Sequence, residues 1–136
     1  MANAFYNKGL ENLWNGNINW EAGDIKVVLV NHGVDAPVVA TDEFLSDIGA
    51  TARIATSANI ASKTLVAGVI DSTVNLTIST VSGATVESMS LYVDSGAAST
   101  SELFIYIDTV TPPFPFTPNG GDLTIEWNAS GIASIA

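Results

Sequence analysis

The chain has 136 residues, a length that fits a single domain spanning 1–136. It carries 14 acidic and only 4 basic residues, which gives a formal net charge of −10. Because nucleic acids and anionic lipids both attract basic side chains, this charge argues against nucleic-acid and membrane partners. The chain has no cysteine, which excludes disulfides, thiolate metal sites and cysteine nucleophiles.

The first residues lack the long apolar core of a secretory signal. No stretch of the sequence reaches the roughly 20 apolar residues of a membrane-spanning helix. Charged residues make up 13 % of the chain, and Ser and Thr replace much of the usual share. Hydroxyl groups cost less to bury than charges, so neighbouring subunits could cover such a surface. A Ser- and Thr-rich β protein with a free surface explains the same composition.

The N-terminal segment 3–15 predicts the one convincing helix. Asn3 can cap it, and Gly9 inside it indicates close packing against a neighbouring element. Its apolar residues recur at helical spacing and are Phe5, Tyr6, Leu10, Leu13 and Trp14. A second, short helical turn is expected over 41–48, where acidic residues cluster at the N-terminal end.

From residue 24 onwards, apolar and polar residues alternate with the period of two that is typical of strands. Turn-forming residues separate the alternating segments. Residues 25–30 are apolar on both faces, which predicts a strand covered on both sides. The strands are expected at 25–30, 52–57, 63–70, 73–79, 88–93, 103–107, 123–127 and 131–136. The predicted fold is mainly β, a single-domain β-sandwich or distorted barrel with a short N-terminal helix.

Candidate catalytic and metal-binding residues are few, and each has a simpler explanation. His32 is the only histidine, and it lies in an expected loop with Asp35 nearby. A solvated loop residue is favoured over the base of a small hydrolase. Aspartates that could bind Ca²⁺ stand where Asx turns explain them, and they are Asp71, Asp94, Asp108 and Asp122. We therefore predict a protein that is not an enzyme, with no catalytic residue, cofactor or metal.

Aromatic side chains offer a different kind of site, because exposed rings stack on sugars. Trp20, Tyr92 and Tyr106 are the candidates for exposed aromatic contacts. Trp14 lies on the apolar stripe of the expected helix, and Trp127 shares a strand face with apolar residues. For these two tryptophans, packing in the core is the favoured interpretation.

The segment 111–118 holds four prolines and two phenylalanines. Proline stiffens the chain and removes backbone donors, so this segment cannot be a central strand. Aromatic rings on a rigid loop lose little entropy on docking and could anchor a partner protein, or they could cover the end of the sandwich. The residues predicted to contact a partner protein are Phe5, Tyr6, Leu10, Phe114 and Phe116.

Five stretches resemble short virion proteins of tailed bacteriophages, and the resemblance extends over nearly the whole chain. They are MANAFYNKGL (1–10), DIKVVLV (24–30), EFLSDI (43–48), RIATS (53–57) and TPNGGDLTI (117–125). Members with an assigned role are similar to capsid decoration, or cement, proteins. The insert 112–116 is richer in Pro and Phe than the family pattern at this point.

The resemblance implies a β-rich homo-oligomer, often a trimer, on the outer capsid surface of a virion assembled in the host cytoplasm. Its implied partner is the major capsid protein. A protein that bridges shell subunits opposes the outward pressure of packed DNA by mass action, and symmetric copies add avidity. The alternative function is a tail or fibre module that binds a host-surface glycan through exposed aromatic residues.

Overall fold

The structure is a computed structural model that describes residues 3–110, 113–129 and 131–134. Its N-terminal half contains β1 (Ala4–Phe5), α1 (Asn7–Trp14), β2 (Ile25–Val30), the 3₁₀ helices η1 (Leu45–Asp47) and η2 (Ala50–Ala52), β3 (Arg53–Thr56) and β4 (Lys63–Val66). The remaining elements are β5 (Val69–Ser72), β6 (Leu76–Ile78), β7 (Ser88–Val93), β8 (Glu102–Ile107), β9 (Leu123–Ile125) and β10 (Ala133–Ser134).

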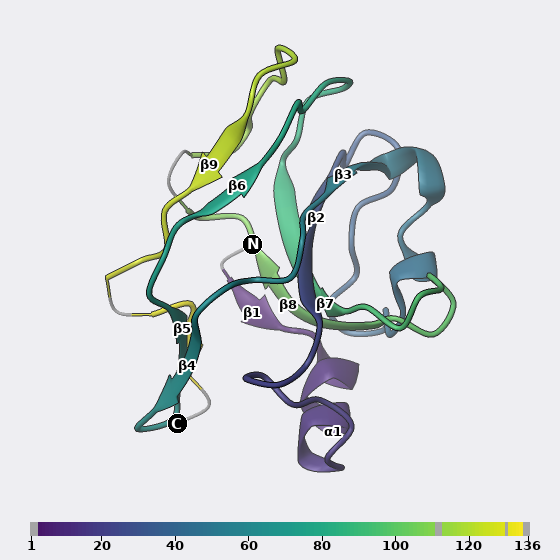
Figure 1. Ribbon diagram of the computed structural model, residues 1–136. Coiled ribbons are helices and arrows are strands. Elements are labelled where there is room, and N and C mark those ends of the chain that lie inside the picture. The colour runs from purple at the N-terminus through teal and green to yellow at the C-terminus, as the bar shows by residue number, and fades with distance from the viewer. Residues whose placement is uncertain (1–2, 111–112, 130, 135–136) are drawn as a thin grey trace.

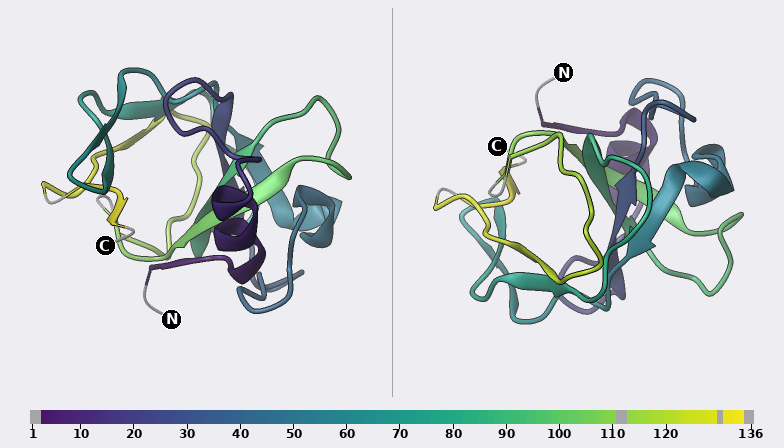
Figure 2. Two further views of the ribbon diagram at one scale, coloured as in Figure 1. Left: turned by 90° about the horizontal axis from the view of Figure 1, so that it is seen from below. Right: turned by 90° about the horizontal axis from the view of Figure 1, so that it is seen from above.

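The strands form one large and two small antiparallel sheets (Figure 1). The central sheet has five strands in the order β1-β8-β7-β2-β3, and the small sheets have the orders β10-β5-β4 and β6-β9. In the end-on views of Figure 2, β4–β5 and the pair β6–β9 face the central sheet across a common centre. The mainly β, sandwich-like fold predicted from the sequence is confirmed.

Both faces of the central sheet are covered, as the apolar pattern of β2 predicts. Ile25, Val27 and Leu29 point into a core between the central sheet and the small sheets, which we call the first core. Val28 and Val30 point to the opposite face, into a second core. The second core is completed by residues from elsewhere in the chain, namely Tyr6, Leu45, Ile48, Ala52, Tyr92, Leu103 and Tyr106.

The alternation predicted for 103–107 is wrong at its first residue. Leu103 was expected on the same face as Ile105, but it lies in the second core, and Phe104 joins Ile105 in the first. The pairing of β7 with β8 shifts register between Leu91 and Tyr92, and this irregularity reorients the start of β8. A bulge of this kind changes the face to which successive side chains point.

The helix is shorter than the segment 3–15 because its first residues form a strand. Residues 4–5 pair with β8, so α1 begins at Asn7. Asn3 does not cap the helix, and its Oδ1 instead accepts hydrogen bonds from the backbone N–H groups of Asp108 and Thr109. Tyr6 occupies the N-cap position without a side-chain cap. Residues 3–5 thus hold the N-terminal segment against β8 and the residues that follow it, at the edge of the central sheet.

Close packing at Gly9 is confirmed. A Cβ atom at Gly9 would lie 2.7 Å from the carbonyl oxygen of Phe104, so only glycine lets α1 lie this close to β8. The buried residues of α1 are Gly9 and Asn12, whereas Trp14 is 77 % exposed. The prediction that Trp14 packs on an apolar stripe is therefore wrong, because the helix faces the sheet with its small residue.

Two further segments differ in detail from the prediction. The strand expected over 63–70 is a hairpin in which Ala67 and Gly68, with φ of 52° and 78°, turn the chain between β4 and β5. Positive φ at both central residues is the geometry of a tight hairpin turn. The turn expected over 41–48 contains the short 3₁₀ helix η1, where Asp47 Oδ2 accepts hydrogen bonds from two backbone N–H groups.

Candidate protein-interaction surface

The N-terminal residues predicted to contact a partner are mostly committed to the fold. Tyr6 is 0 % exposed, and its hydroxyl lies 2.6 Å from Ser90 Oγ. Phe5 is half-buried and packs on Phe104, with 5.4 Å between ring centroids. Leu10 is half-buried as well. The prediction of an interface at Tyr6 is wrong, because its ring fills the second core.

The two phenylalanines of the Pro-rich segment also pack inward. Phe114 and Phe116 are half-buried and lie against the first core. The backbone of Phe116 exchanges two hydrogen bonds with Val86, with N–O distances of 2.7 and 2.8 Å. Residues 111 and 112 lie outside the described residues. The structure thus favours the interpretation in which both rings cover the core over that of free docking anchors.

The aromatic residues predicted to be exposed are buried. Trp20, Tyr92 and Tyr106 are only 3 to 4 % exposed. The indole N–H of Trp20 donates to the carbonyl oxygen of Thr64 at 2.9 Å, and burial raises the pKa of both tyrosines. Exposure of these three residues is therefore a wrong prediction, since they lie in the two cores. Glycan stacking has no platform at these positions.

A row of polar side chains lies along the face of β7 that points to the second core. Ser88 and Ser90 are both 0 % exposed, and Ser88 Oγ lies 2.6 Å from Nε2 of His32. The ring of His32 also lies 6.3 Å from that of Tyr106, so the histidine is half-buried and not the solvated loop residue expected. Because Ser88 has no exposed surface, an attacking role would need the covering segment to move. In this conformation the pair acts as a structural hydrogen bond.

Two of the aspartates that could bind a metal, Asp94 and Asp122, make hydrogen bonds within the fold. Asp94 accepts hydrogen bonds from Lys26 at 2.5 Å and from the backbone N–H of Gly96 at 3.0 Å, and these lower its pKa. Asp122 accepts a hydrogen bond from the backbone N–H of Thr80. Among the described residues, no group of three or more His, Cys, Asp or Glu is arranged to bind a metal. No helix within those residues is long and apolar enough to cross a membrane.

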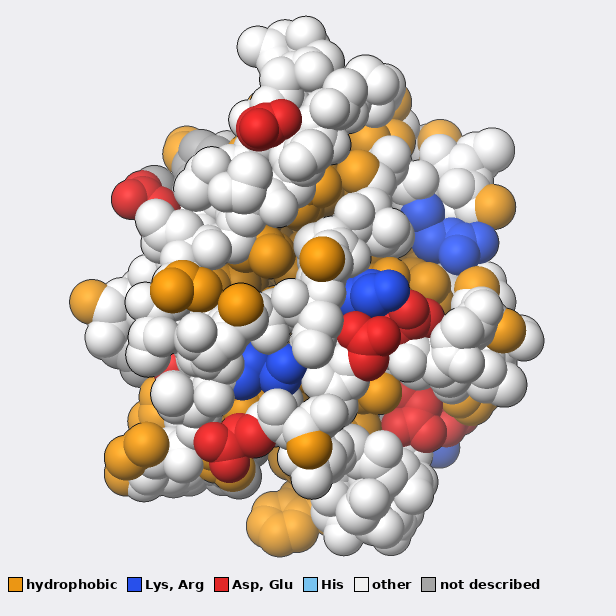
Figure 3. Space-filling view, viewed as in Figure 1, with side chains coloured by type: hydrophobic (Ala, Val, Ile, Leu, Met, Phe, Trp, Pro, Cys, Tyr) orange, Lys and Arg blue, Asp and Glu red, His pale blue; other side chains and the backbone are white. Residues whose placement is uncertain are grey.

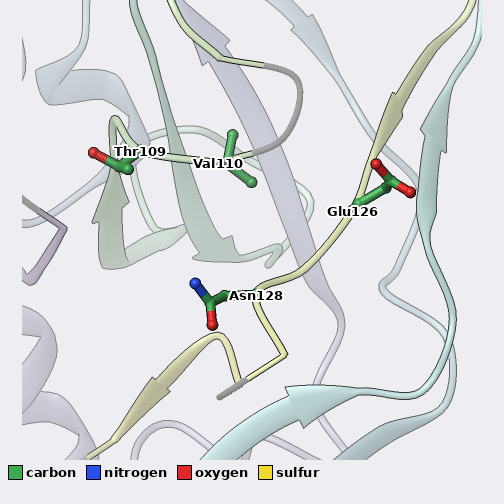
Figure 4. Close-up of a pocket in the computed structure, with 4 residues that line it drawn as sticks. All are labelled: Thr109, Val110, Glu126 and Asn128. Carbon is green, nitrogen blue, oxygen red and sulfur yellow. The ribbon is translucent and has the colours of Figure 1, made fainter.

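A small pocket of about 140 Å³ lies between the segments that follow β8 and β9 (Figure 4). Thr109 and Val110 line it from one side, and Glu126 and Asn128 line it from the other. Glu126 is the only titratable group among these four lining residues, so the pocket lacks the paired groups that acid–base chemistry requires.

Sequence reasoning missed the apolar residues that the structure leaves exposed. Within the described residues, the large exposed hydrophobic side chains are Trp14, Val34, Val38, Leu65, Val66 and Val74. Three of them, Trp14 in α1 and Leu65 and Val66 in β4, lie at the end of the molecule where α1 and the β4–β5 hairpin project (Figure 1). Figure 3 shows hydrophobic side chains on the surface at this lower end of the view.

Between these two elements lies a groove of about 330 Å³, which we call the α1–hairpin groove. Its lining is mainly apolar and includes Leu13, Ile18, Trp20, Leu65 and Ile70. Exposed Trp14 and Val66 stand next to lining residues in the sequence. Exposed apolar clusters are typical of surfaces that contact a protein, a membrane or a ligand. Two lone signals could have found it, namely the tryptophan at the end of a short helix and the Leu-Val pair before a tight turn.

Comparison with known proteins does not assign the chain to a family. No protein-family model matches the sequence, and no curated protein is significantly similar to it.

Proposed function

We propose that this protein is a structural subunit of a bacteriophage virion, a decoration protein that binds the outer head surface and stabilises contacts between shell subunits. The observation that carries the proposal is the exposed apolar cluster around the α1–hairpin groove. Such a molecule acts by packing against other protein subunits. The resemblance of five sequence stretches to short virion proteins is the reason for proposing a bacteriophage particle as the assembly.

The charge of the chain supports a place outside the shell. A net charge of −10 repels packaged DNA, so the protein is best placed where the capsid wall separates the two. Its surface is rich in Ser and Thr, which are cheaper to desolvate than charged groups when a neighbouring subunit covers them. The proposed partner is therefore the major capsid protein, which the decoration protein binds without covalent chemistry.

Binding of this kind stabilises a shell through mass action. A subunit that binds only the assembled shell shifts the equilibrium away from separated shell subunits. Several copies held in one symmetric oligomer multiply modest single contacts. The glycan-binding alternative has no comparable support, because the three aromatic residues proposed for it are buried.

Cryo-electron microscopy of the intact particle tests the proposal. We expect density for the β-sandwich on the outside of the head, repeated at symmetry-related positions between shell subunits. As a biochemical check, the heads of particles that lack the protein should break open at lower temperatures or lower chelator concentrations than those of complete particles. Added purified protein should restore the resistance. Finding the protein only in the tail, or absent from the particle, contradicts the proposal.

A further inference from the structure

We propose that Asn15 is a site of spontaneous deamidation, in which its neutral side-chain amide becomes a carboxylate at the edge of the α1–hairpin groove. The inference goes beyond the proposed function, because the modification depends only on the fold around this residue. The chain contains two Asn-Gly pairs, Asn15-Gly16 after α1 and Asn119-Gly120 before β9. The two pairs share one chemistry but differ in their surroundings, and the difference singles out Asn15.

The reaction needs a backbone nitrogen that can reach the side chain of the asparagine before it. The nitrogen of Gly16, after losing its proton to solvent, attacks Cγ of Asn15. The Cγ–Nδ2 bond breaks, ammonia leaves, and a cyclic succinimide forms between the two residues. Water then opens this ring at either carbonyl group, which yields aspartate or isoaspartate. Glycine favours the attack, because it has no Cβ atom beside the nitrogen and its backbone adopts many conformations.

Both Asn-Gly pairs lie in exposed turns that leave room for the reaction. Gly16 and Gly120 have φ of 81° and 85°, and a Cβ atom added to either would meet nothing within 4 Å. Water and hydroxide therefore reach both pairs, and crowding does not distinguish them.

The side chain of Asn119 is held, whereas that of Asn15 is free to turn. Asn119 Oδ1 accepts a hydrogen bond from the backbone N–H of Gly121 at 2.9 Å, in an Asx turn. Asn15 makes no side-chain hydrogen bond within residues 3–110, 113–129 and 131–134. The amide of Asn15 can therefore rotate toward Gly16 without losing a partner, whereas that of Asn119 must first break a hydrogen bond.

The attacking N–H groups also differ in how they are held. The N–H of Gly16 donates to the carbonyl oxygen of Leu13 at 3.1 Å, at the end of a helix of 8 residues. Helix ends fray locally, so this N–H is released without disturbing the sheets. The N–H of Gly120 donates to the carbonyl oxygen of Val81 at 2.8 Å, and Val81 is buried in the first core. Its release separates the turn from the segment that follows β6.

The product changes the edge of the α1–hairpin groove. Asn15 is the C-cap of α1, and its neighbour Gly16 lines the groove together with Leu13. A carboxylate at this position is unfavourable, because the C-terminal end of a helix already presents negative charge. Glu21 and Asp24 are exposed and close in sequence to lining residues, so acidic charge is already present nearby. Isoaspartate also lengthens the backbone before Gly16, so deamidation alters both the charge and the shape of this edge.

Peptide mapping by mass spectrometry of the full chain, incubated at mildly alkaline pH, tests the inference. Trypsin separates the two pairs, because cleavage after Lys8 and Lys26 releases residues 9–26, whereas Asn119 stays in 64–136. We expect Asn15 to convert about tenfold faster than Asn119, as for one further hydrogen bond that must break. In the chain unfolded in urea, both should convert at similar rates. Equal rates in the folded chain, or no conversion at Asn15, overturn the inference.

Asn15→Gln is the matched control, because glutamine keeps the neutral amide but closes a larger ring, which forms more slowly. Its peptide 9–26 should keep its mass over the same incubation. If this peptide converts as fast as that of the wild type, another residue is responsible and the inference fails. An equal preference for Asn15 over Asn119 in urea would contradict the structural cause, since the preference would then come from the sequence.

The consequence for the groove rests on the proposed function and has its own test. Asn15→Asp carries the new charge from the start, and it should bind heads that lack the protein severalfold more weakly than Asn15→Gln. The difference should shrink in high salt, which screens exposed charges. Equal binding of the two variants contradicts the effect on the groove. If no form of the protein binds heads, the proposed function fails, whereas the mass spectra still decide the modification.

Discussion

The two faces of the central sheet are covered in different ways. Two small sheets cover one face, and the first core, between them and the central sheet, is built from aliphatic side chains with Met89, Phe104 and Trp20. The segment between β2 and β3 covers the other face with little regular structure beyond two 3₁₀ turns. The second core behind it contains three tyrosines, and the buried Ser88 and Ser90 lie on the same face of the sheet.

This difference follows from how each cover satisfies its backbone. Paired strands bond their N–H and C=O groups to one another, so their inner faces can be wholly apolar. An irregular segment lacks such partners and must find them on the sheet. Accordingly, the N–H of Leu45 donates to Ser101 and that of Leu103 donates to Glu43. We expect the first core to contribute most to stability, whereas the second core adds polar contacts and pH dependence.

Phe104→Ala should have the largest effect. The ring is 0 % exposed and contacts the rings of Phe5 and Trp20. Its loss should lower the free energy of unfolding by about 3–5 kcal/mol, measured by urea denaturation. Leu45→Ala in the second core should cost about 2 kcal/mol, because the irregular segment can relax into the space. Equal losses from both substitutions would contradict the proposed difference between the first core, under the small sheets, and the second core, under the segment between β2 and β3.

Phe116→Ser tests whether the Pro-rich segment belongs to the first core. The ring is half-buried against that core, and the backbone is tied to Val86. We expect the free energy of unfolding to fall by about 2 kcal/mol, since part of an aromatic side chain returns to water. The exposed Val74→Ser is the control and should have little effect. If Phe116→Ser leaves stability unchanged, the ring is available for docking, which is the other of the two interpretations drawn from the sequence.

The strand pattern could be predicted because it is local. In β7, Met89 and Leu91 point to the first core and Tyr92 to the second, as the alternation requires. The two-sided cover of β2 was readable for the same reason. The bulge in β8 was not, since a register shift depends on the partner strand and not on the sequence of one strand. It sent Leu103 to the opposite core.

The candidate surface was mostly not predictable. The burial of Ser88 and Ser90 could not be predicted, because nothing near them in the sequence reveals that a distant segment covers them. Trp14 follows Leu10 at the helical spacing of four residues, but the helix packs through Gly9, which turns the indole into solvent. Aromatic residues look alike in a sequence whether they are buried or exposed. Only the packing of α1 on β8 distinguishes Trp14 from Trp20.

Tyr6→Phe tests the polar contacts of the second core. The hydroxyl of Tyr6 lies 2.6 Å from Ser90 Oγ in a site without solvent, and burial raises its pKa well above the ordinary value. Removing it should cost about 1–2 kcal/mol, because Ser90 is left without its buried partner. The double variant with Ser90→Ala should cost less than the sum of the single variants. Strict additivity would show that the two groups do not interact.

The smallest effect on stability comes from carboxylates near the segment between β2 and β3, which covers the second core. Burial raises the pKa of Glu102, and the nearby charge of Glu43 raises it further. Burial likewise raises the pKa of Asp42, with Asp47 adding to the effect. In the unfolded chain these carboxyls keep their ordinary pKa, so the folded state binds protons first as the pH falls below 7. Protonation of Glu102 and Asp42 should therefore stabilise the fold down to the ordinary carboxyl range.

Glu102→Gln should remove part of this pH dependence. At pH 7 we expect the variant to be more stable by about 0.3 kcal/mol, a small value because solvent screens the site. The rise in stability on acidification should be correspondingly smaller than in the wild type, measured by urea denaturation between pH 7 and 4. Asp94 has the opposite sign, because Lys26 lowers its pKa and its stabilisation disappears only at lower pH. Glu126→Gln, at an exposed residue, is the control. If it changes the pH dependence of the free energy of unfolding equally, then net charge, and not the carboxylates near the second core, sets that dependence.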